Sequence, residues 1–324
     1  MNARRKYVLV GALAALVAGI CVAQYERGRG RGDFRDGGYG QNGSWVRTEG
    51  SGWVNEDTVR TARETISHST GTPNWTNAPG FEKDVFTFAR VIFKSTPRGP
   101  LGWGGRGGRL GWWVDYPDAE LNLSYRLQQM TSLRADPDCR VLKLTDPTLT
   151  DYPLLYMEHA GYMELRDEEV TALRKYLLNG GALFVNDFWS MPEWDWFEAQ
   201  MKIVLPGRAW TELTMRDPLF RCICDLKGPM QSLQVPTKQF WNRDHDPRDP
   251  DSPLQRVYRG EGSEEMHVRA WLDDKQRPMI LVIHNSDISD GWEREGEDLE
   301  YFEKFSEKIS YPLGINIVFY LMTH

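Results

Sequence analysis

The sequence predicts an α/β domain built on a parallel sheet. The stretch from Asp151 to Trp189 carries this prediction, because it reads as strand, polar turn, amphipathic helix, Gly-Gly stop and second strand. A βαβ unit of this kind places its two strands in parallel. Two further observations agree with a folded domain. The 324 residues are enough for a large core, and the hydrophobic content of 40% is ordinary for a folded protein.

The first 23 residues have the layout of a secretory signal peptide. Three basic residues, Arg4 to Lys6, precede an apolar run from Tyr7 to Val22, and Ala23 is a small residue suited to cleavage. The run is shorter than the roughly 20 residues that span a bilayer. We therefore expect an exported, periplasmic protein with no stable membrane span after cleavage. A Sec-type signal is the first expectation, although the paired arginines also resemble a twin-arginine signal.

Residues 24–80 are expected to form a flexible Gly/Arg-rich tether followed by a poorly defined segment, with a helix over Glu56 to Ser67. The folded domain is expected over residues 81–324. A net charge of −7 argues against general nucleic-acid binding, which needs phosphate neutralisation. The 13 Trp residues suit either burial or contact with ring-shaped ligands, and burial is the commoner use.

Export would leave Cys139, Cys222 and Cys224, an odd count that allows one disulfide at most. Cys222 and Cys224 flank one residue within a predicted strand, so their side chains are expected on one face of it. A CxC pair is also a fragment of some metal sites, but no second ligand pair lies nearby in the sequence. Small buried apolar residues are the favoured interpretation.

The first elements of the domain follow from local patterns. Phe86 to Phe93 is β-branched and aromatic, as in a buried strand. A glycine-dense loop, Arg98 to Gly111, precedes a helix from Ala119 to about Ser132 that Asp118 is expected to cap. Further strands are predicted over Arg140–Leu144, Leu154–Met157, Ala182–Val185 and Leu219–Leu226, and as a hairpin over Met266–Leu272 and Met279–Ile283. Further helices are predicted up to Asn179, over Trp194–Met201, and from Tyr311 to the end of the chain.

The order of these blocks resembles a bacterial family known as domain-of-unknown-function family 4159. The resemblance covers about residues 84–324, and it is carried by the segments FTFARVIF, WWVDYPDAELNLSYRLQQMTSL, PLLYMEHAGYMELRDEEVTALRKYLLNGGALFVNDFW and YPLGINIVFYLMTH. It implies a class I glutamine amidotransferase-like fold, which is a flavodoxin-like three-layer sandwich with a mostly parallel sheet. The family name carries no activity. Some relatives are fused to, or encoded beside, von Willebrand A-type and MoxR-type ATPase components, which implies a place in envelope assemblies.

The glutaminase activity of the parent fold is not expected in this chain. Glutamine amidotransferases carry a nucleophilic Cys on a sharp turn between a strand and a helix, and this turn corresponds to Phe184–Phe188. No Cys, Ser or Thr stands there. Covalent acyl transfer needs an activated nucleophile paired with a base.

Candidate site residues lie just after the predicted strands, because ligands of open parallel sheets bind beyond the carboxyl ends of the strands. The candidate catalytic residues are Glu158, His159, Asp187 and His284. A carboxylate beside an imidazole can act as an acid/base pair, while the structural alternative is a histidine that bonds backbone in a tight turn. His159 and His284 are also candidate metal ligands. Together with Asp187 and Asp287 they would suit zinc or manganese, and no other cofactor is expected.

The candidate ligand-binding residues are Trp113, Asp115, Tyr116, Asn186, Trp189 and Asp287. Asp115 and Tyr116 precede a helix start, where unpaired N–H groups are available. The glycine-dense loop is predicted to be a mobile lid that carries Trp103, Trp112 and Trp113. The structural alternative is a surface loop beside two core tryptophans.

Two functions fit these observations. The first is a non-catalytic binding or assembly module of the cell envelope, whose partner is another envelope protein or a small polar ligand. The alternative is a metal-dependent or acid/base hydrolase that acts on carbohydrate or a related envelope substrate, by analogy of fold alone. His and Asp side chains that converge in a pocket would favour the hydrolase, whereas the same residues engaged by backbone groups would favour the module.

Overall fold

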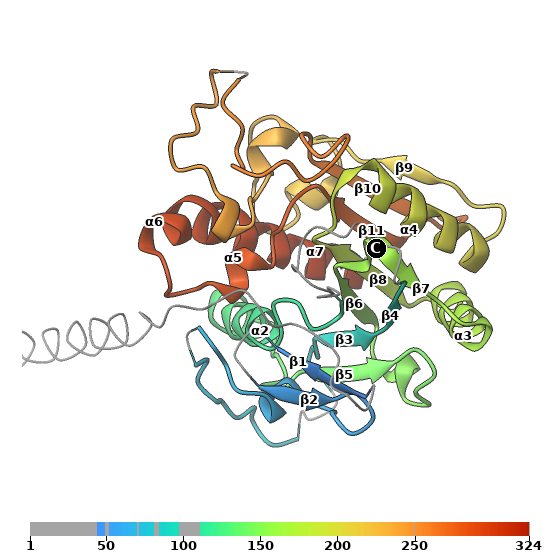
Figure 1. Cartoon of the computed structure of the whole chain (residues 1–324). Helices are drawn as coiled ribbons and strands as arrows, with labels where there is room; N and C mark the ends of the chain where they lie inside the picture. The colour runs from blue at the N-terminus through green and yellow to red at the C-terminus, as the bar shows by residue number, and fades with distance from the viewer. Residues whose placement is uncertain are drawn as a thin grey trace, which may run out of the picture.

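The computed structural model describes residues 44–48, 52–69, 71–80, 84–96, 111–249 and 251–323. Its centre is a seven-stranded sheet of order β5-β3-β6-β8-β11-β10-β9 (Figure 1). The five parallel strands are β5 (Arg140–Lys143), β3 (Ala89–Ile92), β6 (Leu154–Glu158), β8 (Ala182–Asn186) and β11 (Pro278–His284). The antiparallel strands β10 (His267–Leu272) and β9 (Trp210–Glu212) complete one edge. The predicted mostly parallel sheet is confirmed.

Helices cover both faces of this sheet. One face carries α3 (Asp167–Leu178) and α4 (Ser190–Val204), and the other carries α2 (Asp118–Met130), α5 (Asp290–Glu293) and α7 (Tyr311–Thr323) (Figure 1). The central strands are therefore buried on both faces, which explains their nearly continuous apolar sequences. This arrangement is a three-layer sandwich of the flavodoxin-like kind. None of the described helices is both long and apolar enough to cross a membrane.

Smaller elements surround the sheet. They are the hairpin β1 (Trp45–Arg47) and β2 (Trp53–Asn55), the pair β4 (Lys94–Ser95) and β7 (Met163–Glu164), the short helix α6 (Leu299–Tyr301) and the π-helix η7 (Phe302–Ser310). Single 3₁₀ turns are η1 (Ala62–Glu64), η2 (Leu149–Asp151), η3 (Ala160–Tyr162), η4 (Pro218–Phe220), η5 (Met230–Leu233) and η6 (Lys238–Phe240). Val46, Val54, Val59 and Ala62 belong to the hydrophobic core, so the segment before β3 packs onto the sheet domain.

Two local predictions near the start of α2 are wrong. The predicted helix over Glu56–Ser67 is only the turn η1, because the end of this segment bonds to α2 instead of continuing a helix. Asp118 is the first residue of α2, and Pro117 takes the N-cap position. The Asp118 carboxylate instead accepts hydrogen bonds from the Ser67 hydroxyl and the His68 backbone N–H.

The predicted strand over Leu219–Leu226 is also wrong, since only the turn η4 forms there. The side chain of Asn316, on α7, accepts from the backbone N–H of Cys224 at 2.7 Å and donates to its carbonyl at 2.8 Å. These bonds satisfy backbone groups that a neighbouring strand would otherwise have paired. Cys139, Cys222 and Cys224 are all free thiols.

Most of the predicted glycine-dense loop, together with Trp103, lies outside the described residues, as do the predicted signal peptide and most of the tether. Trp112 and Trp113 are described and belong to the core, at 0% and 2% exposed. The Trp112 indole N–H donates to Glu56 Oε1 at 2.7 Å. The lid prediction is therefore wrong for these two residues, and the alternative of two core tryptophans holds.

Gly291 lets α5 pack closely against η7. A Cβ atom at this position would lie 2.0 Å from Ser310 Oγ and 2.6 Å from Ser310 Cβ. We expect Gly291→Ala to lower the free energy of unfolding by about 1–3 kcal/mol in urea denaturation, because the added methyl group overpacks this contact. Adding Ser310→Gly returns the space and should recover the loss, apart from about 0.5–1 kcal/mol for glycine in a helix. An equal loss in the single and double variants would contradict this explanation.

Candidate functional site

Six buried carboxylates meet at the carboxyl ends of the parallel strands. This strand-end acidic cluster consists of Asp115, Glu158, Asp187, Asp287, Asp290 and Glu293, each at most 3% exposed. Glu158 ends β6, Asp187 and Asp287 follow β8 and β11, α5 supplies two carboxylates, and the turn before α2 supplies Asp115. Buried carboxylates normally need a counter-charge, a proton or a metal. The surroundings of the cluster therefore decide what it can do.

The cluster contains two triads that share Asp115. In the Glu158 triad, one carboxylate oxygen from each of Asp115, Glu158 and Asp287 lies within 4.8 Å of the other two. In the Glu293 triad, Asp115, Asp290 and Glu293 meet the same condition. Carboxylates this close repel one another when all are ionised, so they share protons or bind cations.

Arg90 is the basic partner of the Glu158 triad. It lies fully buried on β3, and its Nη2 is 2.8 Å from Glu158 Oε2. The same guanidinium pairs with Glu120 and donates to the carbonyl oxygens of Trp112 at 2.6 Å and Val114 at 2.7 Å. One cation is therefore divided between two carboxylates.

Among the described residues, Asp287 accepts hydrogen bonds from neutral donors. It accepts from the Thr237 hydroxyl at 2.7 Å, from the Asp290 backbone N–H at 3.0 Å and from the Ser289 hydroxyl at 3.2 Å. Burial raises the pKa of Asp287 well above its ordinary value, and nearby carboxylates add to this effect. Burial also raises the pKa of Glu158 to about 7, against the effect of Arg90. Two of the three carboxyl groups of the Glu158 triad therefore hold their protons more tightly than a free carboxyl group does.

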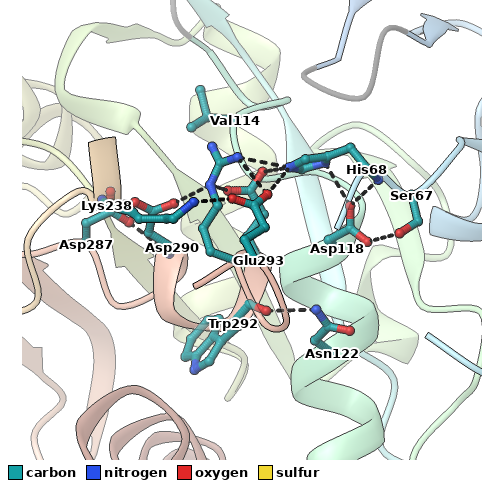
Figure 2. Close-up of polar contacts among 12 residues, drawn as sticks. Ser67, His68, Val114, Asp118, Asn122, Lys238, Asp287, Asp290, Trp292 and Glu293 are labelled. Atoms are coloured by element: carbon teal, nitrogen blue, oxygen red, sulfur yellow. Dashed lines mark hydrogen bonds and ion pairs between the residues drawn. The ribbon is translucent and has the colours of Figure 1, made fainter. Parts of the chain in front are cut away.

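The Glu293 triad, in contrast, holds basic groups of its own (Figure 2). Arg294 Nε lies 2.9 Å from Asp290 Oδ1 and 2.6 Å from Glu293 Oε2. His68 Nε2 lies 2.7 Å from Glu293 Oε1, and its other ring nitrogen is 2.8 Å from Asp118. Arg294 and His68 therefore already contact the carboxylate oxygens that a cation would need as ligands.

Four of the predicted site residues are brought together: Asp115, Glu158, Asp187 and Asp287. Two others border them. The Asn186 side chain donates to Ser289 Oγ at 2.7 Å, and the Trp189 indole N–H donates to Asp187 Oδ1 at 2.7 Å. Trp113 and Tyr116 instead lie in the core, where the Tyr116 hydroxyl donates to the Thr61 carbonyl at 2.9 Å.

The two predicted histidines lie toward α4, away from the acidic cluster. His284 Nε2 is 3.0 Å from the Ser190 carbonyl oxygen and its Nδ1 is 3.3 Å from Arg269. Burial, with help from Arg269, lowers the pKa of His284 to about 3, so its ring is neutral. His159 is the N-cap of η3 in a left-handed conformation. Burial raises the pKa of Glu193 on α4, and the neighbouring His159 opposes this effect. The structure does not assemble the predicted ligand set of two imidazoles and two carboxylates.

Strand register explains why His284 and Glu158 lie apart. β11 pairs with β8 so that Val282 faces Val185, and side chains two residues apart share a face. His284 therefore points to the same side as Val185. Glu158 pairs with Asn186, which points to the opposite side.

Several residues of the site were not predicted: His68, Arg90, Asp118, Glu120, Ser289, Glu293 and Arg294. A signal existed for Arg90, because a lone charge within an apolar strand has to be paired when buried. Asp290 and Glu293 also follow a strand end and lie one helical turn apart, which puts them on one face. Nothing in the local sequence marks His68, because its partners lie 50 and 225 positions away in the chain.

The fold and the site together define an α/β sandwich with a mostly parallel sheet and a buried acidic site at its strand ends. The chain belongs to the family described as a domain of unknown function, DUF4159, whose model matches residues 104–322. The matched region begins after β3, although β3 lies between β5 and β6 in the sheet. A comparison with curated proteins found no match.

Proposed function

We propose that this protein is an exported, non-catalytic binding module of the cell envelope, and that its strand-end acidic cluster holds a divalent cation. The observation that carries the proposal is the convergence of six buried carboxylates, three of them in a triad whose Glu158 shares Arg90 with Glu120. A divalent cation would neutralise such a triad and connect β6 to the loop after β11. The N-terminal sequence, with its basic residues and apolar run, supports export.

Burial and residue types favour binding over catalysis. The carboxylates are almost inaccessible, so an ion fits the site better than a polymeric substrate does. The end of β8 and the turn after it, Phe184–Phe188, contain no Cys, Ser or Thr. His284 bonds a backbone carbonyl, which suits a structural role better than proton transfer.

The test is metal analysis of the purified protein, followed by chelation and return of Ca²⁺ or Mn²⁺ during thermal unfolding. We expect a bound cation in near-stoichiometric amount. We also expect added cation to stabilise the chelated protein by about 2.7 kcal/mol at a concentration 100 times the Kd. Absence of both metal and stabilisation would refute the proposal. A buffer without divalent cations, brought to the same ionic strength with K⁺, is the control for a general salt effect.

A metal-dependent hydrolase is the second candidate, and one observation favours it. Asp115 belongs to both triads, and a pair of neighbouring metal ions is the arrangement that many two-metal hydrolases use. Two equivalents of metal, with metal-dependent cleavage of glycan fragments from the cell envelope, would support this candidate. One equivalent without turnover would support the binding module.

A further inference from the structure

The two triads differ in the charges that surround them. The carboxylates of Asp290 and Glu293 contact Arg294 and His68 at 2.6–2.9 Å. Asp287, in the Glu158 triad, accepts only from neutral donors within the described residues. Each triad contacts an arginine, but Arg294 bonds two carboxylates of the Glu293 triad, whereas Arg90 bonds only Glu158 of the other triad and also pairs with Glu120. Two cations side by side repel, so a bound ion is more strongly disfavoured in the Glu293 triad. The Glu158 triad is the better cation site for this reason.

A second, independent feature points to the same place. Tyr156 precedes Glu158 by two residues on β6, so the two side chains share a face. It is 1% exposed, and its hydroxyl has no hydrogen-bond partner of good geometry among the described residues. The Ser289 hydroxyl is near Tyr156, but its oxygen already contacts Glu158, Asp287 and the Asn186 amide. An unpaired buried hydroxyl is destabilising, and a water bound to a cation at the triad would supply the missing partner.

The ligand atoms decide the class of ion. The Glu158 triad offers carboxylate oxygens, with the hydroxyls of Thr237 and Ser289 beside them. Both predicted histidine ligands lie toward α4, and the cysteines bond elsewhere. An all-oxygen set suits hard cations such as Ca²⁺, Mg²⁺ and Mn²⁺ rather than zinc or copper.

We propose that the Glu158 triad binds one hard divalent cation, and that Arg294 and His68 keep the Glu293 triad from binding a second. This inference rests on the proposed function, because it locates the cation within the cluster and sets its number. Asp115 would then be a ligand only of the ion in the Glu158 triad. The site connects β6, the turn before α2 and the loop after β11.

The experiment compares matched substitutions in the two triads by calorimetric titration with Ca²⁺. Glu158→Gln and Asp287→Asn remove one charge each from the proposed site without changing side-chain size. Glu293→Gln and Asp290→Asn make the same change in the other triad. We expect the first pair to weaken Ca²⁺ binding by roughly 100-fold or more. The second pair should change it by less than about tenfold, through long-range charge alone.

Each outcome has a distinct meaning. The reverse pattern would place the ion in the Glu293 triad and overturn this inference while leaving the proposed function intact. Equal effects of all four variants, or a stoichiometry of two, would also overturn it. No Ca²⁺ binding by the wild-type protein, and none of Mg²⁺ or Mn²⁺, would refute the proposed function and this inference with it.

Tyr156→Phe provides a second route if the charge variants fail to fold. It removes one hydroxyl from the same face of β6 and leaves every charge in place. We expect it to fold and to weaken Ca²⁺ binding by roughly tenfold, as loss of an outer-shell hydrogen bond does. An unchanged affinity in this variant, with the charge variants unfolded, would overturn the inference.

Discussion

Replacing Arg90 by Met is expected to lower the free energy of unfolding by about 3–5 kcal/mol, the usual cost of leaving buried charges without their partner. Arg90 is fully buried and is the ion-pair partner of both Glu120 and Glu158. It also donates to the carbonyl oxygens of Trp112 and Val114, which lie in the segment leading to α2. Its loss would therefore leave two carboxylates and two carbonyl groups with fewer donors. Urea denaturation at neutral pH measures the effect.

Arg140→Met is the matched control, because Arg140 lies on the neighbouring strand β5 and makes the same kind of ion pair near the surface. Its Nη1 is 3.6 Å from Asp136, and a third of its side chain is exposed. We expect this change to cost less than about 1 kcal/mol. Adding Glu158→Gln to Arg90→Met should restore part of the lost stability. Similar losses of unfolding free energy for the two arginine variants would show that the buried partners of Arg90 add nothing to its contribution.

The cation-free protein is expected to become less stable as the pH rises, and Glu158→Gln should reduce this loss. Burial raises the pKa of Glu158 from 4.5 to about 7, so the folded state binds this proton more tightly than the unfolded state. The resulting stabilisation is complete below about pH 4.5 and is lost as the pH rises through about 7. Between about pH 5 and pH 8 the wild-type protein should lose on the order of 2 kcal/mol more than the variant.

His284 acts in the opposite direction and has to be separated from Glu158. Because its pKa is lowered to about 3 from 6.5, its contribution to stability is lost as the pH falls below about 6.5. Both proteins contain His284, so the difference between their curves isolates the effect of Glu158. Urea denaturation with chelator present, at four pH values across this range, is the measurement. Parallel curves for the two proteins would contradict the prediction.

Local sequence patterns predicted most of the sheet correctly. β3, β5, β6, β8 and the β10–β11 hairpin all form where the β-branched and apolar runs indicated. α2 and α3 also match within a few residues, while α4 begins four residues before the predicted Trp194. The errors fall in segments whose backbone groups bond to side chains from distant parts of the chain, such as Asn316 on α7. No local pattern reports such partners.

The candidate site was predicted in part. Glu158, Asp187 and Asp287 follow strand ends, and parallel strands bring such residues to one edge of the sheet. The sequence could not say to which face each side chain points relative to its neighbours. That depends on the register between strands, which turned His284 toward α4. Arg90 and Asp115 join the cluster only because β3 and the turn before α2 pack beside β6.

The sequence by itself determined the class of fold and the edge of the sheet where the site lies, because apolar periodicity and strand order are local properties of the chain. Only the tertiary structure decided which carboxylates meet, which basic groups contact them, and that Asp287 accepts from neutral donors within the described residues. Contacts such as Ser289 with Glu158 and His68 with Glu293 join segments far apart in the chain. Their energies depend on burial and distance, which exist only after folding.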